Sequence, residues 1–265
     1  MRDTSERHVL EERLVRQIRR TSLQYDVLAP DDRVLVAVSG GKDSYGLLHL
    51  LDVLAPRLPF AIEFVAFHID QCQPGYDGTP LARWLEQRGK PFQIVVDDTY
   101  TVVQRNIRAG QTPCSVCSRL RRGILYTWAK RLGCTKVALG HHRDDAVATL
   151  LMNLFYCGKI QSMPARYRTK DGRLDVIRPL IEVAERDLAR LAELAGFPIL
   201  PCNLCARQED HQRKRMGQLI DSLQQEHPRV RNVMLAALKN VWPSHLLDKS
   251  LRKVEVDDDT PSDVC

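Results

Sequence analysis

The sequence predicts an α/β fold, a doubly wound parallel sheet with helical extensions at the N- and C-terminal ends. Short apolar runs rich in β-branched residues alternate along the chain with segments of helical periodicity, as expected when helices join parallel strands. The runs are continuously apolar, which is typical of strands covered on both faces. A glycine-rich loop follows the first strand and polar segments follow two others. Ligands are therefore expected beyond the carboxyl ends of the strands.

The first half of the chain supplies three of the expected strands. A helix is expected from His8 to about Tyr25, because Leu10, Leu14 and Ile18 recur every four residues. The predicted strands are residues 33–38, 60–69 and 92–96, and the helices between them are residues 44–54 and 80–88. Prolines directly after the 44–54 helix explain why it ends there.

The second half is expected to add two strands and four helical segments. Apolar positions spaced by four predict a helix over 115–132, which Gly133 ends. The remaining elements are strands 136–139 and 176–180, helices 146–156 and 184–195, an irregular loop 158–174, and helical structure from 206 to about 241. We divide the chain into a helical extension (1–30), a sheet domain with the paired cysteines (31–205), a helical segment (206–253) and an acidic disordered tail (254–265).

Composition predicts a cytoplasmic protein without a membrane segment. The 265 residues are 44% hydrophobic, and no apolar run approaches the ~20 residues of a membrane span. The first 20 residues mix acidic and basic groups and lack the apolar stretch of a signal peptide. The net charge is +6, and the last twelve residues hold five acids and no base, so residues 1–253 carry +11. A basic body fits a polyanionic partner such as RNA, and equally an ordinary solvated surface.

A pyrophosphate site is predicted in the loop after the first strand, which reads Ser39-Gly40-Gly41-Lys42-Asp43-Ser44. Its glycines allow a tight turn and the close approach of a ligand. The helix that follows offers free N–H groups and a favourable dipole to an anion. The loop fits neither the GxxxxGK[ST] nor the GxGxxG pattern. Ser-Gly-Gly alone would be an ordinary turn, but the complete hexapeptide after a buried strand favours the ligand site.

Four of the eight cysteines form two CxxC pairs, Cys114 with Cys117 and Cys202 with Cys205. The 84 residues between the pairs far exceed the roughly 15–20 of a zinc ribbon, so the tertiary fold would have to assemble a shared site. Thiolates at this spacing bind zinc or an iron–sulfur cluster, which is the expected role. A redox-active dithiol or inert core cysteines are the alternatives.

The hexapeptide resembles the signature of the PP-loop ATP pyrophosphatase superfamily, and a wider pattern resembles the tRNA 2-thiocytidine biosynthesis family. The blocks with this second resemblance are 113–122 (PCSVCSRLRR), 138–145 (ALGHHRDD), 153–156 (NLFY), 177–180 (IRPL), 201–205 (PCNLC) and 241–246 (VWPSHL). The resemblance extends over about residues 10–247, and these blocks are specific in combination. The sequence departs from the family at Cys157, where a glycine is expected; we predict a small core residue there rather than a ligand.

The resemblance implies that residues 31–205 form a PP-loop domain with the adenine nucleotide alpha hydrolase-like fold. It also implies ATP-dependent thiolation of C2 of cytidine 32 in the tRNA anticodon loop, with release of AMP and pyrophosphate. Mg²⁺ and a [4Fe–4S] cluster are the implied cofactors, and three cysteines hold the cluster so that one iron stays open for sulfur. Cys114 and Cys117 match the first two ligands. We choose Cys205 as the third, with Cys202 as an alternative that spacing does not exclude.

The resemblance also assigns the nucleotide site. The residues expected to bind ATP are Ser39, Gly40, Gly41, Lys42, Asp43, Ser44, His68 and Gly140. Asp43 would help to hold Mg²⁺, and Lys42 and Asp145 are the expected catalytic residues. His141 and His142 would close the site. Alternatively, Asp144 or Asp145 only caps a helix, and His68 and Asp70 are ordinary polar residues of a strand end.

The implied partners are tRNA and a sulfur donor such as a cysteine desulfurase. Arginines after the first cysteine pair and on the N-terminal helix are candidates for tRNA phosphates, although they equally suit exposed basic helices: Arg119, Arg121, Arg122, Arg13, Arg16, Arg19 and Arg20. A flipped-out base of the anticodon loop is the expected target. The oligomeric state stays open, with a homodimer as one alternative.

Two other functions are compatible with parts of the pattern. A 2-thiouridine synthase, or another adenylating enzyme, would keep the loop at residues 39–44 and change the acceptor. A non-catalytic iron–sulfur protein that binds RNA would need no ATP cleavage. The intact Lys42-Asp43-Ser44 sequence argues against this last alternative.

Overall fold

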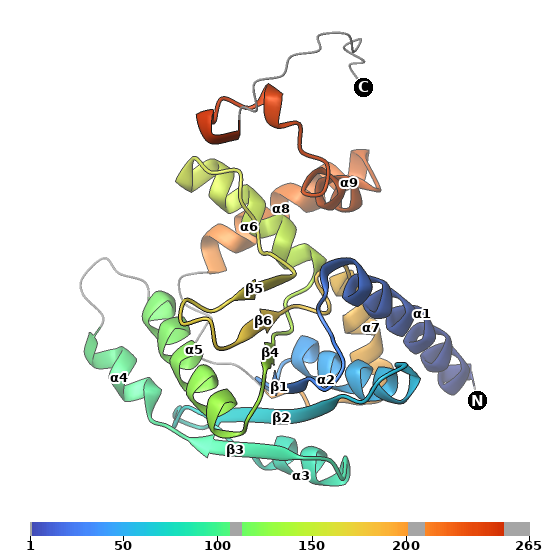
Figure 1. Ribbon diagram of the computed structural model, residues 1–265, viewed down its shortest axis with the longest axis vertical. Coiled ribbons are helices and arrows are strands. Elements are labelled where there is room, and N and C mark those ends of the chain that lie inside the picture. Colours follow the sequence, from blue (N-terminus) through green and yellow to red (C-terminus); the bar gives the residue numbers. More distant parts are fainter. Residues whose placement is uncertain (1, 107–112, 201–209, 252–265) are drawn as a thin grey trace.

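The protein folds around a mostly parallel sheet with helices on both faces (Figure 1). The computed structural model describes residues 2–106, 113–200 and 210–251. Within these ranges the sheet has six strands in the order β3-β2-β1-β4-β6-β5. The strands are β1 (Arg33–Ala37), β2 (Glu63–Asp70), β3 (Phe92–Val96), β4 (Lys136–Ala138), β5 (Arg166–Arg168) and β6 (Asp175–Ile177). The predicted α/β class is confirmed.

Strand β5 was not predicted, because residues 158–174 were expected to be an irregular loop. It pairs antiparallel with β6 at the edge of the sheet. Its two arginines lie two residues apart and bracket one buried carboxylate of β6: Arg166 Nη2 is 2.8 Å and Arg168 Nε is 2.9 Å from Asp175. Cross-strand ion pairs, rather than apolar residues, therefore fix this short edge strand, and apolar periodicity cannot reveal it.

The helices follow the predicted order with one addition. They are α1 (Arg2–Tyr25), α2 (Lys42–Leu54), α3 (Thr79–Gln87), α4 (Thr99–Asn106), α5 (Pro113–Arg131), α6 (Arg143–Cys157), α7 (Glu185–Ala195), α8 (Asp210–Glu226) and α9 (Val230–Ala237). In the described ranges, short 3₁₀ turns occupy Ala55–Arg57, Pro243–His245 and Lys249–Leu251. Helix α4 is the addition; it has only two buried side chains, Thr99 and Val103, and so shows little helical periodicity. None of the described helices is both long and apolar enough to cross a membrane.

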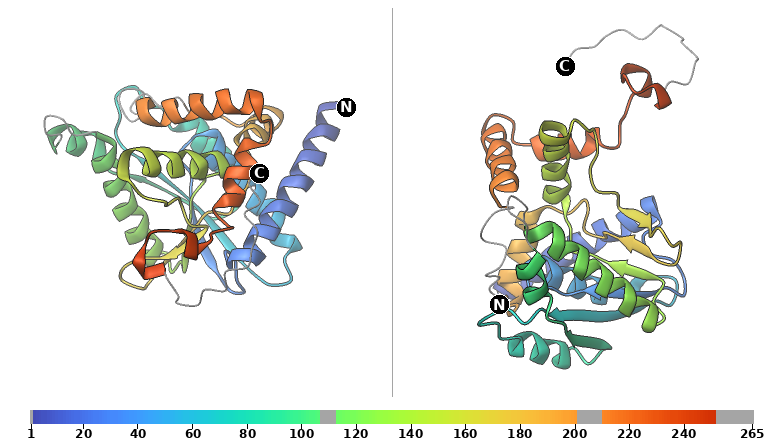
Figure 2. Two further views of the ribbon diagram at one scale, coloured as in Figure 1. Left: turned by 90° about the horizontal axis from the view of Figure 1, so that it is seen from above. Right: turned by 90° about the vertical axis from the view of Figure 1, so that its left-hand side faces the viewer.

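Helices cover both faces of the sheet (Figure 2). A hydrophobic core lies between the helices and the sheet on each face. On one face, α1, α2 and α7 pack together, and Leu14, Ile18 and Leu188 are fully buried there. On the other face, α5 covers Leu35 and Phe67. Because α1 supplies core residues, the N-terminal helix is part of the sheet domain's packing rather than a separate arm.

Helices α6, α8 and α9 form a third cluster beyond the sheet, around Val147, Met216 and Ile220 (Figure 1). Ion pairs attach this cluster to the rest of the protein. Arg231 of α9 lies 2.7 Å from Asp144 of α6, and Lys239 pairs with the buried Glu182. The predicted helical segment after residue 206 is therefore present, and charge pairs join it to the sheet domain.

The strand order reverses between β1 and β4. The chain moves from β1 outward to β2 and β3, and then returns through α5 to β4 on the other side of β1. At such a switch point the loops after two adjacent parallel strands diverge and leave a crevice for a ligand. The loop after β1 and the turn after β4 both leave the sheet at this point.

Candidate active site

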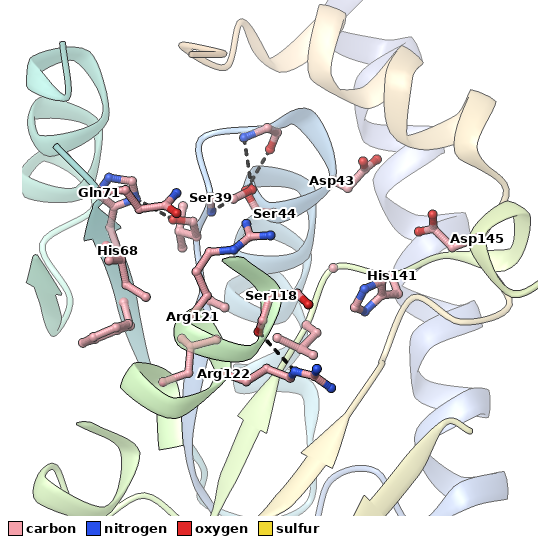
Figure 3. A pocket seen from close by; sticks show the side chains of 18 of the residues that line it. Ser39, Asp43, Ser44, His68, Gln71, Ser118, Arg121, Arg122, His141 and Asp145 are labelled. Atoms are coloured by element: carbon pink, nitrogen blue, oxygen red, sulfur yellow. Dashed lines mark hydrogen bonds between the residues drawn. The ribbon is translucent and has the colours of Figure 1, made fainter. Parts of the chain in front are cut away.

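A cavity of about 650 Å³ opens at the carboxyl ends of β1, β2 and β4 (Figure 3). All three polar segments predicted from the sequence reach it. The predicted site residues that line it are Ser39, Gly41, Asp43, Ser44, His68, Gly140 and Asp145. The switch point therefore holds a space large enough for a nucleotide.

Serine hydroxyls hold the loop after β1 in shape. Ser44 Oγ accepts a hydrogen bond from the backbone N–H of Ser39 (3.1 Å) and donates one to the carbonyl of Gly41 (2.8 Å). Ser39 Oγ lies 3.2 Å from Ser44 Oγ. Helix α2 begins at Lys42 with Gly41 as its N-cap, and a glycine has no side chain with which to satisfy the first N–H groups. The start of α2 therefore presents N–H donors to an anion in the cavity.

Two glycines are required by geometry. Gly40 has φ +87°, and a Cβ atom there would lie 2.9 Å from Leu200 Cδ1. A Cβ atom at Gly140 would lie 3.2 Å from the backbone of Asp43. Gly140 thus allows the turn after β4 to lie directly against the start of α2.

Asp43 and Lys42 contact each other at the start of α2, and of the two only Asp43 lines the cavity. One carboxylate oxygen of Asp43, Oδ1, is buried without a hydrogen-bond partner, and burial raises the pKa of this carboxyl. An unpaired buried carboxylate oxygen in a phosphate site suits a Mg²⁺ ligand. Lys42 Nζ lies 2.9 Å from Glu185 and 3.1 Å from the other oxygen of Asp43, and Lys42 is not among the residues that line the cavity.

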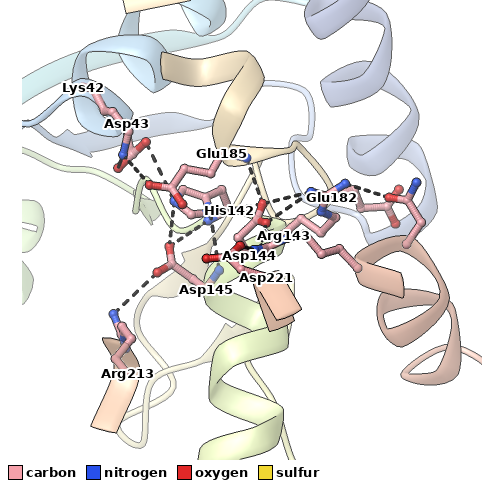
Figure 4. Close-up of polar contacts among 12 residues, drawn as sticks. Lys42, Asp43, His142, Arg143, Asp144, Asp145, Glu182, Glu185, Arg213 and Asp221 are labelled. Atoms are coloured by element: carbon pink, nitrogen blue, oxygen red, sulfur yellow. Dashed lines mark hydrogen bonds and ion pairs between the residues drawn. The ribbon is translucent and has the colours of Figure 1, made fainter. Parts of the chain in front are cut away.

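Asp145 has a structural contact as well as a place in the cavity wall (Figure 4). It forms a capping box with His142: the N–H of His142 donates to Asp145 Oδ2 (3.1 Å), and the N–H of Asp145 donates to His142 Nδ1 (3.4 Å). Its other oxygen lies 3.5 Å from Arg213 of α8. Asp144 instead turns away toward Arg143 and Arg231.

His68 is buried and neutral at the end of β2. Its Nδ1 lies 2.7 Å from the carbonyl of Val38, which can only accept, so Nδ1 donates. Nε2 then accepts from the hydroxyl of Tyr76, whose ring stacks on the imidazole. Burial lowers the pKa of His68 and raises the pKa of Tyr76 to about 12. Asp70 accepts from the N–H of Cys72 (2.9 Å) and does not line the cavity.

Four arginines line the cavity, from three elements. Arg121 and Arg122 come from α5, Arg178 follows β6, and Arg213 comes from α8. Arg121 Nε is buried and has no hydrogen-bond partner. Arg119, the third arginine of the predicted α5 group, is exposed. The sequence interpretation missed Arg178, although its position at the end of a strand was a usable signal, and Arg213, for which the sequence gives no signal.

The paired cysteines are only partly within the described structure. Cys117 of α5 is half-buried, with Sγ 3.4 Å from Oε1 of Gln71, a residue that lines the cavity. The side chain of Cys114 and all of Cys202 and Cys205 lie outside the described residues. No group of three or more metal-binding side chains occurs among those that the structure does describe. A cysteine that contacts a residue of the cavity wall is compatible with a thiolate-held cofactor.

The prediction that Cys157 is a core residue is wrong. It is exposed at the last position of α6, where Gly158 adopts a left-handed conformation and ends the helix. Among the cysteines whose side chains the structure describes, Cys134 is the buried one, and burial raises the pKa of its thiol to about 11. The apolar stripe of α6 faces α8, and its C-terminal turn extends beyond that contact.

Comparisons with known proteins show the family of this chain. Residues 10–200 match the model of the PP-loop domain family. A tRNA-cytidine(32) 2-sulfurtransferase from Anaeromyxobacter dehalogenans (strain 2CP-C) is 49% identical over 246 residues, which are 93% of this chain and 85% of that protein. The chain belongs to this family. A second member, from Sorangium cellulosum (strain So ce56), is 50% identical over 244 residues, or 92% of this chain and 86% of the relative.

A solved structure shows the same fold. The U34-tRNA thiolase NcsA from Methanococcus maripaludis, determined with its [4Fe-4S] cluster, superposes with a TM-score of 0.70. The two are 24% identical, and the match covers 89% of this chain and 81% of that one. The family membership and PP-loop fold expected from the sequence are confirmed.

Proposed function

We propose that this protein thiolates C2 of cytidine 32 in tRNA in the cytoplasm, with consumption of ATP and release of AMP and pyrophosphate. The observation that supports this most directly is the glycine-capped start of α2 in a cavity that four arginines also line. The first feature suits a pyrophosphate, and the arginines suit a polyanionic second substrate. The name shared by the family's curated members gives the reaction that joins the two.

The loop at residues 39–44 would bind the phosphates of ATP. N–H groups of the first turn of α2 and the Ser39 hydroxyl would donate to phosphate oxygens, while Ser44 keeps the loop in shape. Bound Mg²⁺ would be held by Asp43, whose Oδ1 lacks a partner, and would neutralise charge on the leaving pyrophosphate. Lys42 would reach the phosphates by leaving Glu185.

Adenylation would follow by in-line displacement. O2 of cytidine forms a bond to the α phosphorus, and the bond between that phosphorus and the bridging oxygen breaks, so pyrophosphate leaves with the oxygen. The protein's contribution is to hold the two reactants and to stabilise the developing charge. Arg121 and Arg178 supply positive charge, and Asp145 with Arg213 orients the acceptor.

Sulfur would then add at C2, and AMP would depart with the former O2. A [4Fe–4S] cluster, when bound by Cys114, Cys117 and Cys205, would supply an iron site for that sulfur. The contact of Cys117 with Gln71, a residue that lines the cavity, supports this assignment. A sulfur donor such as a cysteine desulfurase would restore the sulfur after each turnover.

Nucleoside mass spectrometry of tRNA from a deletion strain tests the proposal. We expect 2-thiocytidine to be missing and to return with the wild-type gene. Loss of 2-thiouridine with 2-thiocytidine retained would contradict it and would favour a thiouridine synthase. Unchanged thionucleosides would favour an RNA-binding protein without this activity.

Cysteine variants separate the cluster from the nucleotide site. Cys114→Ala should abolish thiolation and leave ATP binding nearly intact, as measured by calorimetry on protein prepared without oxygen. Cys157→Ala is the matched control, since Cys157 is exposed at the end of α6. If Cys114→Ala also removes ATP binding, the cysteines are structural.

A further inference from the structure

The cavity has two sides, separated by the loop after β1 (Figure 3). His68 and Gln71, at the end of β2, lie on one side of Ser44. His141 and Asp145 lie on the other side, beyond β4. His68 is one of the residues expected to bind ATP, so the adenosine would lie on the side at β2 and the tRNA base would be read on the side beyond β4.

Arg178 fixes the protonation of His141. Its Nε lies 3.3 Å from His141 Nδ1, and a guanidinium can only donate. Nδ1 must therefore accept, and the proton of the neutral imidazole is on Nε2. Burial, with the nearby charge of Arg178, lowers the pKa of His141 to about 4 and keeps the ring neutral at physiological pH.

Arg178 itself is rigidly held. The residue is 8% exposed, its Nη1 donates to the carbonyl of Pro164 (2.8 Å), and its guanidinium lies 5.3 Å from the ring centre of Tyr167. The Tyr167 hydroxyl lies 3.0 Å from that of Tyr126. These contacts prevent the arginine from turning, so the imidazole that it supports cannot exchange its donor for an acceptor.

The Nε2–H group of His141 is left for a ligand. Among the described residues no side chain or backbone group forms a hydrogen bond with Nε2, and His141 lines the cavity. A neutral donor of fixed orientation recognises an acceptor, and it disfavours a second donor because both groups would be desolvated and unpaired.

We propose that His141 reads the target base as a cytosine, donating from Nε2–H to N3, and that Arg178 is the positioning residue that fixes this donor. This inference rests on the proposed function. Cytosine has a lone pair at N3, whereas uracil has an N–H there, and both have the same C2 carbonyl. A fixed donor at N3 therefore selects cytidine from uridine before any chemistry occurs at C2.

Thiolation of two tRNA substrates, one with C32 and one with U32, measures the selection as a ratio of kcat/KM values. His141→Leu removes the donor and should lower kcat/KM for C32 about tenfold or more, with little change for U32. His141→Gln presents either an N–H or a carbonyl by rotation, so it should recover part of the C32 activity and raise U32 activity. The ATP affinity of both His141 variants should stay within about twofold of the wild-type value. His227→Ala is the control, since His227 is exposed and lies directly after the end of α8.

An imidazole ¹⁵N spectrum of the full chain, prepared without oxygen, tests the positioning role without any turnover. The wild type should show His141 with unprotonated Nδ1 and protonated Nε2. Arg178→Lys keeps a positive charge but not two donors in a fixed plane, so the His141 signals should show mixed tautomers and the C32/U32 ratio should fall. If Arg178→Lys does not fold, the C32/U32 ratio of kcat/KM values in the His141 variants alone tests the inference.

Three results would overturn the inference: an unchanged C32/U32 ratio in His141→Leu, an equal loss on both substrates, or a loss of ATP affinity that accounts for the activity change. The last would place His141 in the nucleotide site. Failure of the proposed function looks different, because the wild type would then thiolate neither substrate while the His141 spectrum could still show the fixed tautomer.

Discussion

Helices α2 and α6 begin side by side at the switch point, and their first turns are built in opposite ways. Helix α2 starts at Gly41, which has no capping side chain. Helix α6 starts at His142, which forms a complete capping box with Asp145. The two starts touch, since a Cβ atom at Gly140 would lie 3.2 Å from the backbone of Asp43.

The difference separates a binding terminus from a structural one. At the start of α2 the N–H of Ser44 donates to the carbonyl of Gly41 (3.1 Å), and the N–H groups of Lys42 and Asp43, which have no capping side chain, are left to a ligand. This has a cost in helix stability that a cap would remove. Those of α6 are satisfied within the protein, so its acids cap and orient instead of competing for the phosphates. Adjacent helix starts with similar positive dipoles can thus serve different purposes.

The largest expected effect comes from giving α2 the cap that it lacks. Gly41 has φ −88° and ψ 158°, and a Cβ atom there meets only Ser39 Oγ at 3.6 Å, so Gly41→Asp fits without strain. Its carboxylate should occupy the N–H groups and repel phosphate. We expect ATP affinity to fall more than about tenfold while stability rises by a few tenths of a kcal/mol.

Calorimetric titration with ATP measures the expected fall in affinity, and urea unfolding measures the expected rise in stability. Gly41→Ala is the matched control, since it adds a Cβ atom without an acceptor, and it should bind ATP within a few-fold of the wild type. Unchanged ATP affinity in Gly41→Asp would contradict the assignment of the phosphates to the start of α2.

Removing the capping box of α6 should lower the free energy of unfolding. Asp145→Ala loses the acceptor for the His142 N–H, and we expect a loss of about 1 kcal/mol in the free energy of unfolding. Asp145→Asn keeps an acceptor oxygen and should retain most of the stability, while its uncharged side chain loses the ion pair with Arg213. Urea unfolding of both variants measures the difference; equal stability of the two would mean that the box contributes nothing.

The smallest effect concerns pH. The pKa of His141 is lowered to about 4, below its unfolded value of about 6.5, so the unfolded chain binds the proton more readily between these values. Stability from this group is present above about pH 6.5 and is lost as the pH falls toward 4. Between pH 7.5 and 6.0 the loss should be below about 1 kcal/mol. Urea unfolding of His141→Gln should show a shallower pH dependence than the wild type; parallel curves would contradict the buried neutral imidazole.

The sequence was most informative where function and local geometry coincide. The hexapeptide at residues 39–44 predicted both the strand-to-helix loop and the cavity wall, because tight turns and phosphate contacts need particular residues. The segment at residues 140–145 was likewise placed correctly at the end of a strand. The resemblance to a known family then predicted the substrate, which the periodicity of apolar residues cannot reveal.

Contacts between distant segments could not be predicted. Arg178 supports His141 from a neighbouring strand, and Arg213 reaches Asp145 from α8. Both are ordinary arginines in the sequence, and only the tertiary fold makes them part of the site. Cys157 shows the converse: a small apolar residue on a helix was expected in the core, but the helix extends past its contact with α8.

Release of AMP and pyrophosphate from labelled ATP, with anaerobically prepared protein and purified tRNA, tests the central claim most directly. The uncapped start of α2 lies beside the side of the cavity that would read the base. We therefore predict that AMP and pyrophosphate form together and that tRNA with C32 stimulates their release. Gly41→Asp should abolish this stimulation while the protein still folds. Release of ADP and phosphate, or equal stimulation by tRNA that lacks C32, would contradict the account.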